Sequence, residues 1–359
     1  MNRSSRIPSA DDLVRASYQE MTLYTSRREP VAIDLSDNTN QLGPPPAALA
    51  ALREASPDLV SRYPSHYAHD LKRALSDWLG VPTAEIVTGC GSDDVLDSAI
   101  RAFAEPGDAL AYPDPTFAML PYFARMNGLE PKPVPLVANR GFDIDADRLL
   151  ATGAKIIYIC TPNNPTGTLA SVEAIERVLR EATGLVIVDE AYVEYAPASL
   201  VKFAKDAGRL LVARTLSKAF GLAGARVGYA VGAPDIVAAV EKSRGPYKVT
   251  ALAERMAVAA LDGERAWVDA GVAGVLAARA SFVAELRRMG HEPLPSASNF
   301  VLVPIADAAD KAEALRERGV GVRAFSGLTG IGDALRISVG PWAVMARALP
   351  ALKEVLACA

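Results

Sequence analysis

Short apolar runs alternate with amphipathic segments through roughly the first 250 residues of this chain. The runs are rich in Val, Ile and Leu and are almost uninterrupted by polar residues, which is typical of strands buried on both faces. The predicted strands are Glu85–Thr88, Ala109–Tyr112, Lys155–Cys160, Leu185–Asp189, Leu210–Thr215 and Val227–Val231. The predicted helices between them include Ser92–Ala104, Thr116–Asn127, Val172–Ala182 and Ser199–Ala207. This alternation predicts an α/β fold with a mostly parallel sheet covered by helices on both faces.

The pattern changes after about residue 250. A long alanine-rich helical stretch comes first, and shorter strands and helices follow it. They are Glu264–Met289 (helix), Asn299–Val303 (strand), Asp310–Arg318 (helix), Val320–Arg323 (strand), Leu335–Val339 (strand) and Trp342–Cys358 (helix). We therefore expect a large domain over residues 35–250 and a small α+β domain over residues 251–359. Residues 1–34 fit neither pattern and are predicted to form an arm that packs on the small domain.

Composition excludes several classes of function. A chain of 359 residues with a net charge of −4 has no excess of basic residues for binding nucleic acid or an anionic membrane. The N-terminus lacks the apolar core of a secretory signal, and we expect no apolar stretch to approach the length of a membrane span. We expect a cytoplasmic location. The few cysteines and histidines lack the spacing of a disulfide framework or a metal site: Cys90, Cys160, Cys358, His66, His69 and His291.

One lysine stands in an unusual setting. Lys218 lies among small and apolar neighbours, with hydroxyls just before it at Thr215 and Ser217 and an arginine, Arg226, eight residues later. A desolvated lysine without nearby carboxylates loses its proton easily and becomes a nucleophile. Hydroxyls and an arginine suit a phosphate. An amine beside a phosphate site is what pyridoxal 5'-phosphate (PLP) requires; an exposed Ser-Lys loop with an unrelated arginine is the simpler alternative.

Polar side chains follow two of the predicted strands, where ligands of such sheets collect. Asp189 ends a strand apolar enough to be central, and a partly desolvated carboxylate needs a cationic or donor partner such as a protonated pyridine nitrogen. A plain capping role is the alternative. The turn Thr161–Gly167 presents two side-chain amides after Lys155–Cys160. An asparagine there is able to donate to a phenolate oxygen, or the segment is an ordinary Asn/Pro turn.

Three further features are weaker. Gly89–Asp94 precedes a predicted helix, and its glycines allow backbone N–H groups to approach an anion at the helix start, although many helices begin this way. Phe117, just past a strand, is placed either to lie against a planar ring or to fill the core. Arg336 lies within an apolar strand and needs an anion, which is a substrate carboxylate or a structural acid.

The order of four motifs, N-N-P-T-G, D-E-A-Y, T-L-S-K-A-F-G and L-R-I-S-V-G, makes the argument specific. With them the chain resembles the fold-type I, class I/II aminotransferases, which use PLP, and among these it looks most like the histidinol-phosphate aminotransferases. The resemblance extends from Asp34 to Gly340. It implies an aspartate-aminotransferase-like fold and transfer of an amino group from an amino acid, or histidinol phosphate, to a 2-oxo acid such as 2-oxoglutarate.

The resemblance also implies roles for residues. Lys218 would bind PLP as an aldimine and later move the proton between the substrate α-carbon and the cofactor. Asp189 would pair with the pyridine nitrogen, while Asn164 and Tyr192 would bond the phenolic oxygen. The other implied cofactor contacts are ring stacking by Phe117 and phosphate binding at Gly91, Ser92, Asp93, Thr215, Ser217 and Arg226. Tyr63 would reach the phosphate of a neighbouring subunit, which implies a homodimer with shared sites. The implied substrate contacts are Arg336 on the α-carboxylate, Asn40 close by, and Arg323 on a distal phosphate or carboxylate.

The chain departs from the histidinol-phosphate aminotransferase pattern at three positions. Leu42 stands where a tyrosine is usual, and Lys248 and Thr250 alter the usual P-Y-N-V-N. Lys248 is either a substitute phosphate ligand or a solvated side chain. The alternatives are therefore an aromatic or other amino-acid aminotransferase and a lyase resembling threonine-phosphate decarboxylase, whose pattern Gln41–Gly43 partly echoes. A PLP-sensing regulator is disfavoured, because the family pattern begins by residue 34 and leaves no room for a DNA-binding module.

Overall fold

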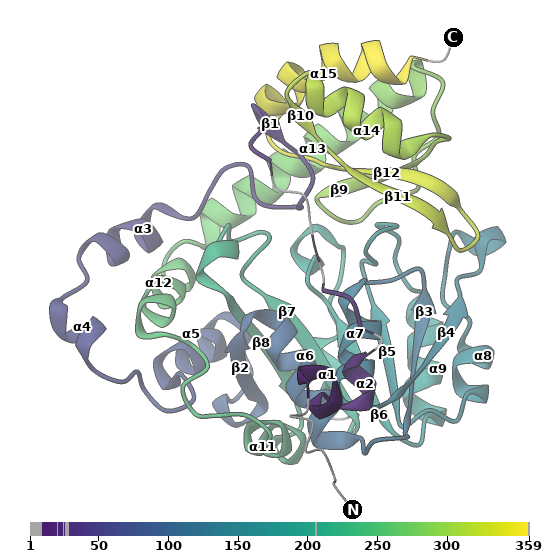
Figure 1. Ribbon diagram of the computed structural model, residues 1–359. Helices are drawn as coiled ribbons and strands as arrows, with labels where there is room; N and C mark the ends of the chain where they lie inside the picture. Colours follow the sequence, from purple (N-terminus) through teal and green to yellow (C-terminus); the bar gives the residue numbers. More distant parts are fainter. Residues whose placement is uncertain (1–8, 20, 24, 26–28, 205–206, 358–359) are drawn as a thin grey trace, which may run out of the picture.

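The computed structural model describes residues 9–19, 21–23, 25, 29–204 and 207–357. Its centre is a seven-stranded sheet (Figure 1). In spatial order the strands are β2 (Ile86–Cys90), β8 (Val227–Gly232), β7 (Leu210–Thr215), β6 (Leu185–Asp189), β5 (Ile156–Cys160), β3 (Ala109–Asp114) and β4 (Glu130–Pro135). All neighbours are parallel except that β8 runs antiparallel to both β2 and β7. The predicted mostly parallel sheet is confirmed.

Helices cover both faces of this sheet, because its central strands bury alternate side chains in opposite directions. In β6, Leu185 and Ile187 join one apolar core, whereas Val186 and Val188 join the other. The first core is closed by α6 (Gly91–Phe103), α7 (Met119–Met126) and α11 (Pro234–Lys242). The second is closed mainly by α5 (His69–Leu79), α8 (Ala146–Ala151), α9 (Val172–Glu181), α10 (Val201–Ala204) and α12 (Ala251–Leu261). Two helices, α3 (Pro46–Arg53) and α4 (Pro57–Ser61), extend outward beside α12 (Figure 1).

A second, smaller sheet lies above the first in Figure 1. It is antiparallel, in the order β11 (Arg323–Leu328), β12 (Gly332–Ser338) and β9 (Phe300–Pro304). It is accompanied by α13 (Arg265–Arg288), α14 (Ala308–Glu317) and α15 (Trp342–Leu356). The β11–β12 turn meets the large sheet, where Thr329 donates a hydrogen bond to Asp114.

The N-terminal segment divides its contacts between the two parts of the molecule. Strand β1 (Ile33–Asp34) pairs in parallel with β10 (Val320–Gly321), so the chain enters beside the small sheet. Earlier in the chain come α1 (Ala10–Leu13) and α2 (Ala16–Gln19), and α2 contacts α7 of the large part. The packing of the arm on the small domain stays a prediction, for which the β1–β10 pairing is the supporting contact.

Helix α13 corrects the expectation that no apolar stretch approaches the length of a membrane span. Among the described residues it is the one helix long and apolar enough to cross a membrane by length and composition. Its buried residues recur on one side of the helix: Val268, Val275, Ala278, Phe282 and Leu286. A single buried stripe that contacts α15 and β9 is the pattern of a helix packed on a protein core.

Candidate active site

Three predicted residues meet because their strands are adjacent and parallel. Asp189 ends β6 and stands opposite Cys160 of β5 and Ala213 of β7 in register. Asn164 and Lys218 follow the carboxyl ends of β5 and β7. This edge is where ligands bind in open α/β sheets.

Asp189 is a buried carboxylate that is held by neutral donors. Its Oδ2 accepts a hydrogen bond from the Tyr158 hydroxyl at 2.8 Å, and its Oδ1 accepts one from the Ala191 N–H at 3.0 Å. No ion pair to Asp189 occurs among the described residues. Burial raises the pKa of Asp189 to about 6, against the two hydrogen bonds, which lower it. Such a group favours a cationic partner, as a pyridinium nitrogen would be.

The amine of Lys218 lies in surroundings that favour its neutral form. Its side chain is half-buried, and its Nζ lies 5.5 Å from the centre of the Tyr192 ring. Burial lowers the pKa of Lys218 to about 8, and the positive charge of Arg336 acts in the same direction. A substantial fraction of the amine is therefore neutral, and nucleophilic, near pH 8.

Asn164 and Tyr192 each leave one hydrogen-bond donor available to the site. Arg336 donates from Nη1 to Asn164 Oδ1 at 2.6 Å, which fixes the amide and leaves its NH2 as the free end. The Tyr192 hydroxyl accepts from Asn38 Nδ2 at 3.0 Å, and the ring is buried edge-on against Phe300. Burial raises the pKa of Tyr192 to about 12, so its hydroxyl stays protonated at neutral pH.

The start of α6 is arranged as an anion site. Gly91 has φ +79°, and a Cβ at this position would collide with the guanidinium of Arg226, which therefore lies directly against the helix start. Arg226 Nη2 is 3.2 Å from Asp93 Oδ2. Across from it, the backbone N–H of Ser217 donates to Thr215 Oγ1 at 3.1 Å. A helix N-terminus, an arginine and two hydroxyls are suitable ligands for a phosphate.

Two arginines stand side by side at the small sheet. Arg323 of β11 and Arg336 of β12 are cross-strand partners in register. Arg336 is 8% exposed and also donates from Nη2 to the Ser36 carbonyl at 2.7 Å. Asn40 lies near Lys218, since its Nδ2 donates to the Ala219 carbonyl at 2.8 Å. Arg323, Arg336 and Asn40 thus come from three separate segments.

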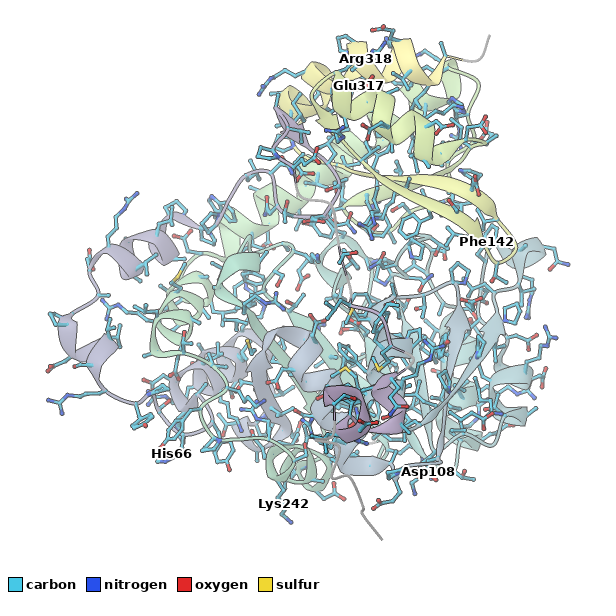
Figure 2. The ribbon with its side chains drawn as sticks, in the orientation of Figure 1. His66, Asp108, Phe142, Lys242, Glu317 and Arg318 are labelled. Atoms are coloured by element: carbon cyan, nitrogen blue, oxygen red, sulfur yellow. The ribbon has the colours of Figure 1, made fainter. Side chains whose placement is uncertain are left out.

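The cofactor contacts of Phe117 and Tyr63 stay predictions. Phe117 is half-buried and packs partly on the α6–α7 core, so its stacking on a ring stays a prediction. Tyr63 is 84% exposed and stacks on Tyr247 with ring centres 5.1 Å apart. Tyr247 also hydrogen-bonds His66 at 2.9 Å, at the outer edge of the large part (Figure 2).

The three departures from the family pattern have local surroundings of their own. Lys248 Nζ is 2.9 Å from Asp94 Oδ1, and the other oxygen of Asp94 accepts the Cys90 N–H. Lys248 is therefore not simply solvated, since it forms an ion pair beside the α6 cradle. Thr250 caps α12 by accepting the Ala253 N–H at 3.2 Å. Leu42 is 47% exposed.

Three residues without a predicted role support the site: Tyr158 holds Asp189, Asn38 holds Tyr192, and Ser338 holds Asn38. Tyr158 was detectable in principle, as a hydroxyl inside the otherwise apolar run I-I-Y-I-C. Sequence reasoning also did not separate the two asparagines of the turn by their surroundings. Asn163 is 4% exposed, accepts from the Thr116 hydroxyl and donates to the Pro115 carbonyl, so it supports the turn.

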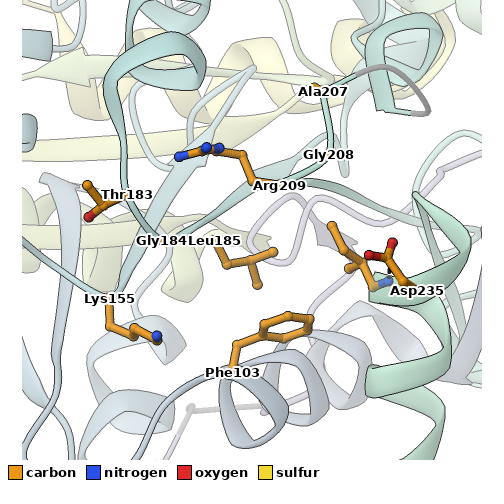
Figure 3. A pocket seen from close by; sticks show the side chains of 10 residues that line it. Phe103, Lys155, Thr183, Gly184, Leu185, Ala207, Gly208, Arg209 and Asp235 are labelled. Carbon is orange, nitrogen blue, oxygen red and sulfur yellow. Dashed lines mark hydrogen bonds between the residues drawn. The ribbon is translucent and has the colours of Figure 1, made fainter.

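A separate cleft of about 530 Å³ lies at the opposite edge of the sheet (Figure 3). It is lined in part by Lys155, Gly184 and Arg209, which immediately precede the starts of β5, β6 and β7. None of the candidate residues lines it, so the candidate site is the one at the carboxyl ends.

Comparisons with known proteins agree with this geometry. The family described as "Aminotransferase class I and II" matches residues 30–352. Histidinol-phosphate aminotransferase 1 of Thiobacillus denitrificans is 41% identical over 336 residues, which cover 91% of this chain and 86% of that protein. Histidinol-phosphate aminotransferase of Thermoanaerobacter pseudethanolicus is 33% identical over 350 residues, 96% of this chain and 99% of that protein.

Solved structures show the same similarity. Histidinol-phosphate aminotransferase from Sinorhizobium meliloti in complex with pyridoxal-5'-phosphate superposes with a TM-score of 0.86 at 29% identity, over 97% of this chain and 98% of that one. Aspartate aminotransferase from Thermus thermophilus, at 22% identity and a TM-score of 0.77, covers 91% of this chain and 92% of its own; it shares the fold.

Proposed function

We propose, from the premise that this chain belongs to the class I and II aminotransferases, that it transfers an amino group between histidinol phosphate and a 2-oxo acid such as 2-oxoglutarate. It is a PLP-dependent transaminase of the histidinol-phosphate aminotransferase family. The observation that carries the assignment of its site is the meeting of Lys218, Asp189 and Asn164 at one sheet edge, with a buried carboxylate that lacks a cation among the residues described.

PLP, when bound, supplies an aldehyde for amines and a ring that accepts electrons from the reacting carbon. In the proposed arrangement Lys218 would bind the aldehyde and would afterwards carry a proton, since its lowered pKa allows both forms near pH 8. Asp189 would keep the ring nitrogen protonated, and Asn164 and Tyr192 would donate to the phenolic oxygen of the cofactor. Gly91, Ser92, Asp93, Thr215, Ser217 and Arg226 form the proposed phosphate cradle, with Phe117 against the ring.

The proposed substrate rests on the relatives and on the arginine pair. The two relatives above are named for histidinol phosphate. Arg323 beside Arg336 offers two positive charges to a phosphate or carboxylate, as a dianionic phosphate requires. Lys248 pairs with Asp94, and Thr250 caps α12. Because both side chains have these structural partners, their departure from the family pattern is weak evidence for a different substrate.

We further propose a homodimer in which Tyr63 completes the phosphate cradle of the partner. A ring that is 84% exposed, yet fixed by stacking on Tyr247, is suited to a contact outside its own chain. A groove of about 740 Å³, lined by residues of α4 and α12, lies beside it and offers a surface for a second copy. The cytoplasmic location stays a prediction of the sequence.

A panel of donors tests the function. Glutamate alone should convert the absorbance of the bound cofactor to that of its amino form, and a 2-oxo acid should restore it. Histidinol phosphate should react with a kcat/KM about a hundredfold above that of histidinol, because two arginines face the phosphate. Aromatic amino acids as the better donors would replace the substrate proposal with the aromatic alternative, and CO2 release without conversion of the cofactor would indicate the lyase.

A matched pair of variants locates the phosphate. Arg323→Gln should remove most of the preference for histidinol phosphate over histidinol. Arg318→Gln is the control, because Arg318 lies at the far side of the small part and pairs with Glu354 (Figure 2). An unchanged preference in Arg323→Gln would show that another group binds the distal phosphate.

A further inference from the structure

Tyr192 belongs to a closed set of buried hydrogen bonds that joins three segments distant in sequence. Asn38 lies in the loop after β1, Tyr192 follows β6, and Ser338 ends β12. Asn38 is 1% exposed, Ser338 0% and Tyr192 3%. Water therefore does not compete for these groups, and each donor needs its protein acceptor.

The backbone sets the direction of this set. The Asn38 N–H donates to Ser338 Oγ at 2.9 Å, and an N–H group is only a donor. The hydroxyl hydrogen of Ser338 is then free to point to Asn38 Oδ1, 3.0 Å away. Because Oδ1 is occupied in this way, the Asn38 amide presents its NH2 to Tyr192. The distance from Asn38 Nδ2 to the hydroxyl oxygen of Tyr192 is 3.0 Å.

The opposite orientation of the Asn38 amide is disfavoured. Flipping it would give Ser338 Oγ a second N–H donor and leave the Ser338 hydrogen without the acceptor that it has now. A buried hydrogen-bonding group without a partner is costly, and such networks are the usual basis for assigning an amide orientation. The backbone is held as well, because Asn299 Nδ2 donates to the Asn38 carbonyl at 2.9 Å.

We infer that Asn38 is a positioning residue that commits the hydroxyl hydrogen of Tyr192 to the phenolic oxygen of the cofactor. Since the oxygen of Tyr192 already accepts from Asn38, its own hydrogen is directed elsewhere, into the site. Asn164 is oriented in the same way, because its Oδ1 accepts from Arg336 and its NH2 is left to donate. Two neutral donors would thus converge on one oxygen. The inference rests on the proposed function, namely on PLP bound beside Tyr192.

The test reverses the bond without changing its shape. Asn38 has φ +55°, which aspartate tolerates about as well as asparagine, so Asn38→Asp keeps the turn. The new carboxylate presents an oxygen to Tyr192, and the hydroxyl hydrogen should then turn to it. The readout is the pH midpoint at which the absorbance of the bound cofactor changes. A donor on the phenolic oxygen stabilises the anion and keeps that midpoint low, so we expect Asn38→Asp to raise it by about one pH unit.

Double variants separate this effect from that of the added charge, since Arg336, Lys218 and Asp189 also act on Tyr192 or its ring. Tyr192→Phe should raise the midpoint by itself, and Asn38→Asp should add little in that background. An equal further rise in the double variant would assign the effect to charge and overturn the inference. Ser338→Ala, which carries no charge, should give a smaller rise, and an unchanged midpoint there would contradict the directed chain even if Asn38→Asp does not fold.

The variants distinguish a wrong placement of the cofactor from a wrong role for Asn38. If Tyr192→Phe leaves the midpoint unchanged, the cofactor does not contact Tyr192 as proposed, and the inference falls with that placement. If Tyr192→Phe raises the midpoint and Asn38→Asp does not, the placement stands and Asn38 has no directing role. Thermal unfolding of each variant without PLP shows whether the fold is retained.

Discussion

The charged form of Asp189, which the proposed function needs, lowers the stability of the folded chain. Burial raises its pKa from an ordinary 3.8 to about 6. The folded chain therefore holds this proton more tightly than the unfolded chain does. The resulting stabilisation is complete below about pH 4 and is lost as the pH rises through 6, by about 3 kcal/mol for a shift of two units.

This sign predicts the behaviour of Asp189→Asn. Asparagine stays neutral, so the variant apoprotein should match the wild type near pH 4 and exceed its free energy of unfolding by up to about 3 kcal/mol at pH 8. Urea unfolding of both apoproteins across this range measures the difference. The variant should at the same time bind PLP more weakly, because it no longer carries a charge for the pyridinium. A constant difference at all pH values would contradict the assigned ionisation.

Single residues were predictable where the chemistry is local. Lys218 was proposed from its apolar neighbours and adjacent hydroxyls, and Asp189 from the apolar strand before it. The residues that orient them were not. The Asn38–Tyr192 bond spans 154 positions in the sequence and the Tyr158–Asp189 bond spans 31, so neither can be read from spacing along one segment.

At the scale of elements, apolar runs predicted the central strands and failed where that signal is absent. Strand β4 has the sequence E-P-K-P-V-P, and its three prolines disfavour a strand. It lies at the sheet edge, with β3 as its one neighbour in the described sheet, where proline is tolerated. The expected strand Val320–Arg323 proved to be two: Val320–Gly321 pairs with β1, whereas Arg323 begins β11 in the small sheet. The strand is divided because its two halves pair with different neighbours, which the strand propensity of its residues does not reveal.

The start of α6 gives a prediction for an element. Gly91→Ala places a Cβ against Arg226 and forces its guanidinium away from the helix start. The affinity for PLP should fall about tenfold, as for the loss of one charge-assisted hydrogen bond. Gly141→Ala is the matched control, since Gly141 has φ +70° and no atom within 4 Å of a Cβ. Both variants should lose about 1 kcal/mol of unfolding free energy from backbone strain. Equal PLP affinity in the two would remove Arg226 from the cradle.

At the scale of the whole molecule, the question is whether one chain holds a complete site. Lys218 lies at the sheet edge, whereas Tyr63 follows α4, which extends outward beside α12 (Figure 1). The ring of Tyr63 is anchored through Tyr247, and Tyr247 immediately precedes Lys248, which pairs with Asp94 in α6. Tyr63 is thus linked, through Tyr247 and Lys248, to Asp94 in α6 of its own chain.

Mixed dimers test this arrangement directly. Lys218→Ala removes the amine and Tyr63→Ala removes the proposed partner contact, so each homodimer should have two defective sites. In a mixed dimer, the subunit with Tyr63→Ala keeps its own Lys218 and receives an intact Tyr63 from the other. One site of wild-type PLP affinity should return, with up to half of the wild-type activity per dimer. Purification through two different tags and titration with PLP measure it. If Tyr63 served its own chain, no site in the mixed dimer would hold both groups, and the affinity would stay at that of Tyr63→Ala.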